Sequence, residues 1–301
     1  MGPVALLLLT AAAPALAHAP DARGAHDALL HWTFEPWVVV PLLIAAALYA
    51  RGIRHLWRNA GRGRGITLAQ VACFAAGWLS LVAALVSPLD TLGGRLFSAH
   101  MVQHEVLMLV SAPLIVLARP LAAWTWAFSL HNRQRIGDGL RPRWWRATWS
   151  FLTEPVAATA LHALALWLWH VPASFEAALH SEAVHALQHT SFLGTALFFW
   201  WAVLGRDSRV SRGGGMALAC LFATMMHTSA LGALLTLAPT PWYPAYAASA
   251  PLFGMDPVED QQLGGLVMWV PGAAAYLWAT LAIASRFLGF RGATQPRAAR
   301  P

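Results

Sequence analysis

Seven long apolar runs dominate this chain of 301 residues and limit what it can fold into. Each holds about twenty residues with few charges, the length that an α-helix needs to cross roughly 30 Å of hydrocarbon. Hydrophobic residues make up 58% of the chain and charged residues only 11%, proportions that exclude an ordinary soluble domain. The sequence therefore predicts an all-α bundle that spans a membrane seven times. The predicted helices cover residues 35–56, 66–86, 96–117, 155–172, 182–204, 214–238 and 260–285.

The arginines lie on alternate connections between these runs and predict how the bundle is oriented. The chain has no lysine, and eighteen of its twenty arginines follow the first, third, fifth and seventh runs. Arg23 and Arg95 lie on the other side, with most of the loop acids, among them Asp90 and Glu182. Since positively charged loops stay in the cytoplasm, we expect the N-terminus outside and the C-terminus inside. The basic charge then serves orientation and contact with anionic membrane lipid, which argues against nucleic-acid binding.

The chain divides into four parts under this interpretation. Residues 1–17 are typical of a secretory signal peptide, with a short apolar core and the sequence Ala-Leu-Ala at its end. Residues 18–34 are then an outward-facing arm, residues 35–290 the transmembrane domain, and residues 291–301 an inward-facing tail.

Histidines and methionines gather in the outer half of the predicted bundle. His100 and His104 lie one helical turn apart in the third run, and Met101 and Met108 fall within about 100° of His100 around the helix. At a rise of about 1.5 Å per residue, further histidines on other runs reach overlapping depths. These are His170 at the end of the fourth run, His185 and His189 one turn apart in the fifth, and His227 in the sixth.

These side chains indicate a metal site. Neutral imidazole and thioether groups suit copper, and methionine favours Cu(I). Because a polar side chain in hydrocarbon is costly, such a group indicates function. The alternative is that the histidines only hydrogen-bond neighbouring helices. The spacing predicts a shallow layer and a deeper layer of ligands. The shallow layer is His100, His170 and His185, and the deeper layer is His104, His189, His227 and Met268.

The stretch from His100 to Glu105, "HMVQHE", is not a zinc-protease motif, because that motif needs the glutamate between the two histidines. Glu105 is instead expected to pair with another helix or to tune the site from outside the ligand shell. The chain also lacks the Gly-x-Ser-x-Gly and phosphate-loop motifs, so a hydrolase is the least favoured class.

Five stretches together resemble the CtaG-type cytochrome c oxidase assembly factors, which are seven-span bacterial membrane proteins. The stretches are "HMVQHEVLMLVSAPLIVLARP", "LWLWHVP", "HALQHTSFLGTALFFW", "MMHT" and "DQQLGGLVMWVPG". The resemblance covers about residues 30 to 290. It implies a non-enzymatic protein of the inner membrane, with residues 18–34 in the periplasm, that helps copper reach the catalytic subunit of a haem-copper oxidase. A periplasmic copper chaperone is the implied donor.

The resemblance also extends the set of candidate metal ligands. Carried over onto this sequence, it adds the polar residues Asp260 and Gln261 at the start of the seventh run to the histidines and Met268. With the methionines of the third run, the full set is His100, His104, His170, His185, His189, His227, Met101, Met108, Asp260, Gln261 and Met268. The chain lacks a Cys-x-Cys element, so copper handling would depend on histidine and methionine.

Two other functions remain open on the sequence. Histidines on separate helices can hold a haem between them, so a membrane b-type cytochrome is one alternative. Copper import across the membrane is the other, but Cys73 and Cys220 are the only obvious soft ligands in the inner half. Neither cysteine belongs to a disulfide framework or a Cys-x-x-Cys motif, and both are typical of small core residues.

Overall fold

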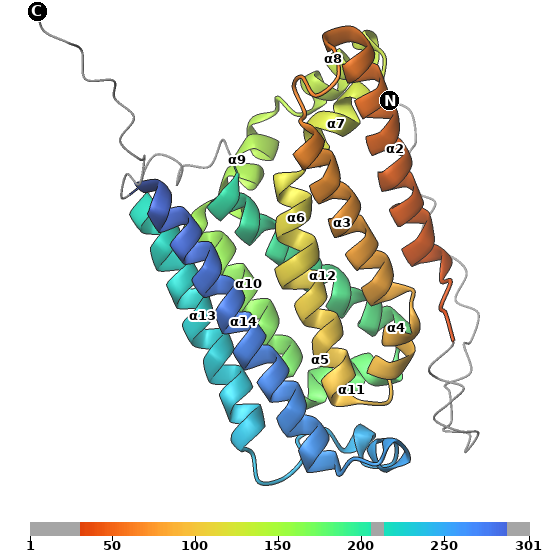
Figure 1. The fold of residues 1–301 in the computed structure, drawn as a ribbon, viewed down its shortest axis with the longest axis vertical. Coiled ribbons are helices and arrows are strands. Elements are labelled where there is room, and N and C mark those ends of the chain that lie inside the picture. Colours follow the sequence, from red (N-terminus) through yellow and green to blue (C-terminus); the bar gives the residue numbers. More distant parts are fainter. Residues whose placement is uncertain (1–30, 206–213, 288–301) are drawn as a thin grey trace, which may run out of the picture.

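A computed structural model describes residues 31–205 and 214–287 as a bundle of helices (Figure 1). No strand occurs in this part of the chain, so the predicted all-α class is confirmed. The predicted signal peptide and the predicted tail fall outside the described residues. The α-helices are α2 (Pro36–Ala60), α3 (Leu68–Leu85), α4 (Pro88–Gly93), α5 (Phe97–Glu105), α6 (Ala112–Leu117), α7 (Pro120–Trp126), α8 (Leu130–Gly139), α9 (Arg143–Leu152), α10 (Pro155–His170), α11 (Pro172–His180), α12 (Glu182–Leu204), α13 (Gly214–Leu237) and α14 (Pro257–Phe287).

Local sequence signals explain where several helices begin. Thr67 forms a capping box with Gln70, in which each side chain bonds to the other residue's backbone N–H, and α3 starts there. Pro155 and Pro172 occupy the first positions of α10 and α11, where the missing N–H costs no helical hydrogen bond. The turn between α2 and α3 is rich in glycine because its backbone takes positive φ angles, including 92° at Gly61.

Each of the seven predicted runs is helical, and five helices are long and apolar enough to cross a membrane. A sixth candidate is the pair α9 and α10, which is bent by 67° between Leu152 and Pro155. The fifth predicted run, α12, is long enough at 23 residues but carries several polar side chains, including His185 and Gln188, that lower its hydropathy. The described chain is therefore a helical membrane protein with five or six helices of this kind.

The two ends of the bundle differ (Figure 1). Helices α7, α8 and α9 lie at one end, with the turn between α2 and α3. Helices α4 and α11 lie at the other end, together with the 3₁₀ helices η3 (Pro244–Tyr246) and η4 (Ala250–Phe253) that precede α14. The arginine-rich connections in the described part of the chain, residues 51–64 and 119–146, thus lie at one end, and the loop acids of α4 and α11 at the other.

Small residues let the helices approach closely. A Cβ atom added to Gly265 of α14 would lie 2.7 Å from the backbone oxygen of Gly232 in α13. A Cβ atom added to Gly77 of α3 would lie 3.0 Å from Leu114 in α6. Such contacts are typical of membrane helices, which associate by close packing because lipid gives little hydrophobic driving force between them.

The third span is not a regular α-helix throughout. The π-helical segment η1 (Val106–Ser111) joins α5 to α6, directly after His104 and Glu105. Its altered hydrogen bonding is compensated from neighbouring helices: Trp200 Nε1 donates to the backbone oxygen of Met108 at 2.8 Å. The hydroxyls of Ser111 and Ser80 lie 2.7 Å apart. Short π-helical insertions are frequent at functional sites, because they change which side chains face inward.

Candidate metal centre

Five histidines from three helices converge at the α4 and α11 end of the bundle. His100 and His104 come from α5, His170 from α10, and His185 and His189 from α12. The ring centres of His100 and His104 are 4.3 Å apart, and those of His185 and His189 are 4.1 Å apart. The two pairs face each other, with 5.3 Å between the ring centres of His104 and His189. We refer to these five residues as the histidine cluster.

Hydrogen bonds to backbone oxygens fix the tautomers of two members. His170 Nδ1 lies 2.7 Å from the backbone oxygen of Leu166. His100 Nδ1 lies 3.3 Å from the backbone oxygen of Gly93 and 3.1 Å from the Tyr246 hydroxyl. A carbonyl oxygen only accepts, so both Nδ1 atoms carry the proton. The Nε2 atoms of both histidines therefore present lone pairs, the form in which imidazole binds a metal.

Several ring nitrogens of the cluster are buried without a hydrogen-bond partner. They are His104 Nδ1, His170 Nε2, His185 Nε2 and His189 Nε2. One ring nitrogen from each of His100, His185 and His189 lies within 4.8 Å of the others. Buried polar atoms are normally paired, so a group of unpartnered nitrogens that converge is the arrangement expected of a ligand set.

His100 and His104 also meet directly. Their Nε2 atoms are 2.8 Å apart, and the Nε2 atom of His100 has no proton to donate because Nδ1 carries it. His104 therefore donates from Nε2 in the metal-free protein, which leaves its Nδ1 as an unpartnered acceptor. Binding a cation at both Nε2 atoms would require the His104 proton to move to Nδ1, because a neutral imidazole keeps one N–H.

Aromatic side chains pack against part of the cluster. Phe175 and Phe192 are fully buried, with ring centres 4.9 Å from His100 and 4.6 Å from His104 respectively. The Tyr243 hydroxyl donates to the backbone oxygen of His170 at 2.9 Å and ties the α13–α14 connection to the site. Such a low-dielectric wall strengthens interactions between a bound cation and its ligands.

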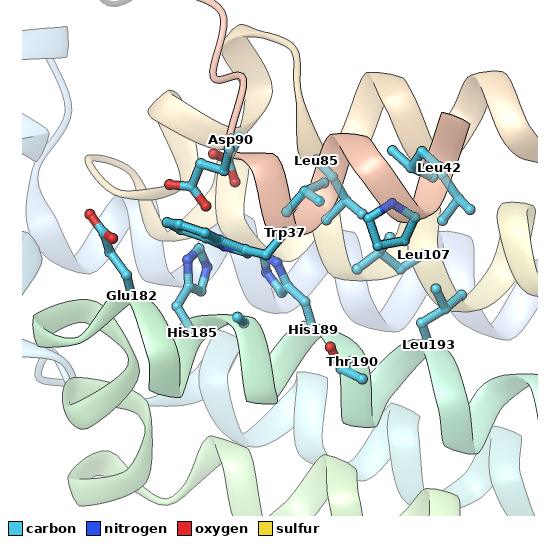
Figure 2. A pocket seen from close by; sticks show the side chains of 15 residues that line it. Trp37, Leu42, Leu85, Asp90, Leu107, Glu182, His185, His189, Thr190 and Leu193 are labelled. Carbon is cyan, nitrogen blue, oxygen red and sulfur yellow. The ribbon is translucent and has the colours of Figure 1, made fainter. Parts of the chain in front are cut away.

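A cavity of about 350 Å³ reaches the cluster from the side (Figure 2). Apolar side chains of α2, α3, η1 and α12 line its deeper part, and His185 and His189 form part of its wall. Three carboxylates, Glu35, Asp90 and Glu182, line the same cavity. The cluster is thus buried in the protein but has a route to the surface.

The three predicted methionine ligands are all buried in the core, at 0% exposure for Met101, 3% for Met108 and 2% for Met268. Met101 points toward α14, because its side chain lies 3.2 Å from a Cβ atom added to Gly264. Met268 follows Gly264 by one turn and shares its face. These two methionines therefore pack in the contact between α5 and α14, whereas the histidines of α5 face α12.

Asp260 and Gln261 have structural partners, which the sequence did not predict. Both Asp260 carboxylate oxygens accept hydrogen bonds from the first turn of α5, including 2.7 Å from the Phe97 N–H and 3.0 Å from the Ser98 N–H. Gln261 accepts from the Trp242 N–H at 2.6 Å and donates to the backbone oxygen of Leu235 at 3.3 Å. In this structure both residues hold chain segments together.

His227 is separated from the histidine cluster, contrary to its predicted place in the deeper layer. Within the described residues, no ring contact joins it to any member of the cluster. Its electrostatic neighbour is His162 of α10, whose Nδ1 lies 3.1 Å from the Thr195 hydroxyl. The reason is helix rotation: α13 packs mainly on α14 and α10 and contacts α12 little, so His227 faces α10.

Tyr246 and Gln103 belong to the site but were missed from the sequence. Tyr246 contacts His100 from a connecting segment 146 residues away. Gln103 is fully buried and donates to Asp90 at 2.8 Å, which links α5 to α4. A glutamine between two histidines of an apolar helix was a usable signal for Gln103. Tyr246 had no local signal.

Glu105 lies on a different face of α5 from the histidines. Its Oε2 atom is buried without a hydrogen-bond partner and lies 3.4 Å from a Cβ atom added to Gly272 of α14. Glu105 therefore faces α14, and its predicted pairing with another helix stays a prediction.

Comparison with known proteins relates the chain to one family. The family described as cytochrome c oxidase caa3 assembly factor (CtaG) matches residues 47–289. Uncharacterized proteins of Mycobacterium bovis and Mycobacterium tuberculosis are each 27% identical over 251 residues, and one of Mycobacterium leprae is 24% identical over 249 residues. Each match covers 79% of this chain but only 36% of the relative, so the chain spans about a third of their length. No solved structure matches the chain.

Proposed function

The chain belongs to the cytochrome c oxidase caa3 assembly factor family, and from this we propose that it holds copper for insertion into the oxidase. The proposed cargo is Cu(I), and the proposed site is the histidine cluster. The protein performs no catalytic step in this proposal: it binds copper on the outer side of the membrane and releases it to the catalytic subunit of a haem-copper oxidase. A periplasmic copper chaperone is the proposed donor.

The observation that carries this proposal is the convergence of imidazole nitrogens, several of which are buried without a hydrogen-bond partner. Three side chains, His100, His185 and His189, have ring nitrogens within 4.8 Å of one another. His104 and His170 supply further imidazoles at the same place, with ring centres 6.4 Å apart. Structural histidines would be expected to have their second nitrogen paired, because an unpaired polar group in the interior costs about 1–3 kcal/mol.

We further propose seven membrane spans with the N-terminus periplasmic and the C-terminus cytoplasmic. The supporting observations are that each predicted run is a helix and that the arginine-rich connections lie at one end of the bundle (Figure 1). In this orientation the histidine cluster opens toward the periplasm. The division into a signal peptide of residues 1–17, an arm of residues 18–34 and a tail of residues 291–301 is part of the same proposal.

The packing beside the histidines supports copper rather than haem in this proposal. Phe175 and Phe192 lie against His100 and His104, with ring centres 4.9 Å and 4.6 Å away, which leaves little room for a porphyrin on these faces. Copper import is also less favoured. Within the described residues, no second group of three histidine, cysteine or carboxylate ligands lies closer to the opposite end.

Cu(I) binding by a purified double variant tests the proposal. Replacing both central ligands, His104→Ala with His189→Ala, should abolish the copper bound per protein after equilibration with excess Cu(I). The matched control is His180→Ala, because His180 is an exposed histidine at the same end of the bundle. Unchanged copper content in the double variant, with the protein still monodisperse in detergent, would refute the site.

A further inference from the structure

The cavity that leads to the histidine cluster has an unusual rim. Three carboxylates from three separate elements line it: Glu35 before α2, Asp90 of α4 and Glu182 at the start of α12. The rest of the lining is mostly apolar, apart from the two histidines and Thr190. We call these three carboxylates the acidic rim.

The carboxylates are close enough to repel one another. Burial, and then the negative charges of Asp90 and Glu182, raise the pKa of Glu35 above its ordinary value. Asp90 is held in place by the Thr33 hydroxyl at 3.1 Å and by the Gln103 amide at 2.8 Å. Like charges held together in the lining of a mostly apolar cavity produce a negative potential that attracts cations.

A buried acceptor lies directly behind the rim. His189 is 8% exposed, lines the cavity, and its Nε2 atom has no hydrogen-bond partner. Figure 2 shows the indole of Trp37 between Asp90 and the imidazoles of His185 and His189. Trp37 is 54% exposed and lines the same cavity as the two histidines.

From this arrangement we infer that the acidic rim is a loading site, where a metal cation from the outer aqueous phase is captured before it passes Trp37 to the histidine cluster. The inference rests on the proposed function and adds the route by which the cargo arrives. The ligand class is a small cation with exchangeable ligands, such as Cu(I) in a labile complex. Carboxylates bind Cu(I) weakly compared with imidazole, so the cation is not retained at the rim.

The loading role predicts a kinetic effect without a loss of capacity. We expect a Glu35→Gln and Glu182→Gln double variant to take up Cu(I) about tenfold more slowly at low salt, because the attraction of the rim is removed. The uptake rate should also depend less on ionic strength. The amount of copper bound at saturation should equal that of the unmodified protein, since the histidines are intact.

The uptake rate is measured by anaerobic stopped-flow mixing. The full chain in detergent is mixed with the cationic acetonitrile complex of Cu(I), and quenching of tryptophan fluorescence is the signal. The matched control is Asp256→Asn with Glu259→Gln, which removes the same charge at the same end but outside the cavity. Glu182→Gln alone is a second variant with little folding risk, because Glu182 is exposed. It should show a smaller decrease in the same direction.

The outcomes separate this inference from the proposed function. An uptake rate equal to that of the control, with copper still bound, would overturn the loading role and leave the histidine cluster intact. Loss of bound copper at saturation would make the carboxylates ligands of the holding site and would also overturn it. If the unmodified protein binds no Cu(I), both proposals fail together.

Discussion

At the scale of single residues, the site depends on which nitrogen of each histidine carries the proton. His170 and His100 are fixed by backbone carbonyls at Leu166 and Gly93, and this leaves their Nε2 atoms available. Outer contacts of this kind orient ligands and raise their basicity, and their loss typically costs ten- to a hundredfold in metal affinity. Tyr246 is such a contact, because its hydroxyl lies 3.1 Å from His100 Nδ1 and donates to Gly93.

Tyr246→Phe should therefore weaken Cu(I) binding about tenfold while leaving the number of bound ions unchanged. Competition with a chromophoric Cu(I) chelator measures the affinity. Tyr49→Phe is the control, because Tyr49 is equally buried but bonds to Ala118, in the second apolar cluster of the bundle. Equal affinities for the two variants would show that Tyr246 does not orient His100.

Asp260 gives a second test at this scale, since its predicted role as a ligand and its observed contacts lead to different results. Asp260→Asn should lower the apparent melting temperature of the copper-free protein, because both Asp260 oxygens accept backbone hydrogen bonds and the amide nitrogen of asparagine cannot accept one. A buried N–H left unpaired costs about 1–3 kcal/mol. Its copper affinity should change little. Asp256→Asn is the control in the preceding turn. A large loss of copper affinity with an unchanged melting temperature would identify Asp260 as a ligand instead.

At the scale of helices, the sequence predicts well where each helix begins and ends, but it predicts poorly which neighbouring helix each face meets. The apolar runs predict the bounds of the seven long helical segments to within a few residues, except at the end of α2 and the start of α14. The spacing of four residues also predicts that His185 and His189 share a face. Which helices a face meets depends on side-chain packing along the whole bundle. His227 has a suitable depth for the cluster, yet it faces His162 because α13 packs on α10 and α14.

The acidic rim could not be predicted from the sequence either, because side-chain packing decides which residues of different helices meet. Asp90 and Glu182 appear in the sequence as ordinary loop acids 92 positions apart, and Glu35 as the residue before an apolar run. Only the packing of α2, α4 and α12 brings them to one cavity. Asp260 shows the opposite error, since a polar residue at the start of a predicted span resembles a ligand until its hydrogen bonds to α5 are seen.

At the scale of the whole molecule, the proposed function requires that the histidine cluster open toward the periplasm. Single cysteines introduced into a variant without Cys73 and Cys220 test this orientation in intact cells. A membrane-impermeant maleimide should label Ser181→Cys, because Ser181 joins α11 to α12 at the cluster end. It should not label Arg141→Cys, because Arg141 lies between α8 and α9, which are at the opposite end. Labelling of Arg141→Cys alone would place the cluster on the cytoplasmic side.

The metal content of the oxidase in a strain that lacks this protein tests the central claim most directly. The account predicts an oxidase that retains its haem but has lost copper from its catalytic subunit. Copper should return with the unmodified protein and with His180→Ala, and not with the His104→Ala and His189→Ala double variant. An oxidase with full copper in the deletion strain, or full recovery with the double variant, would contradict the claim that the histidine cluster supplies copper for assembly.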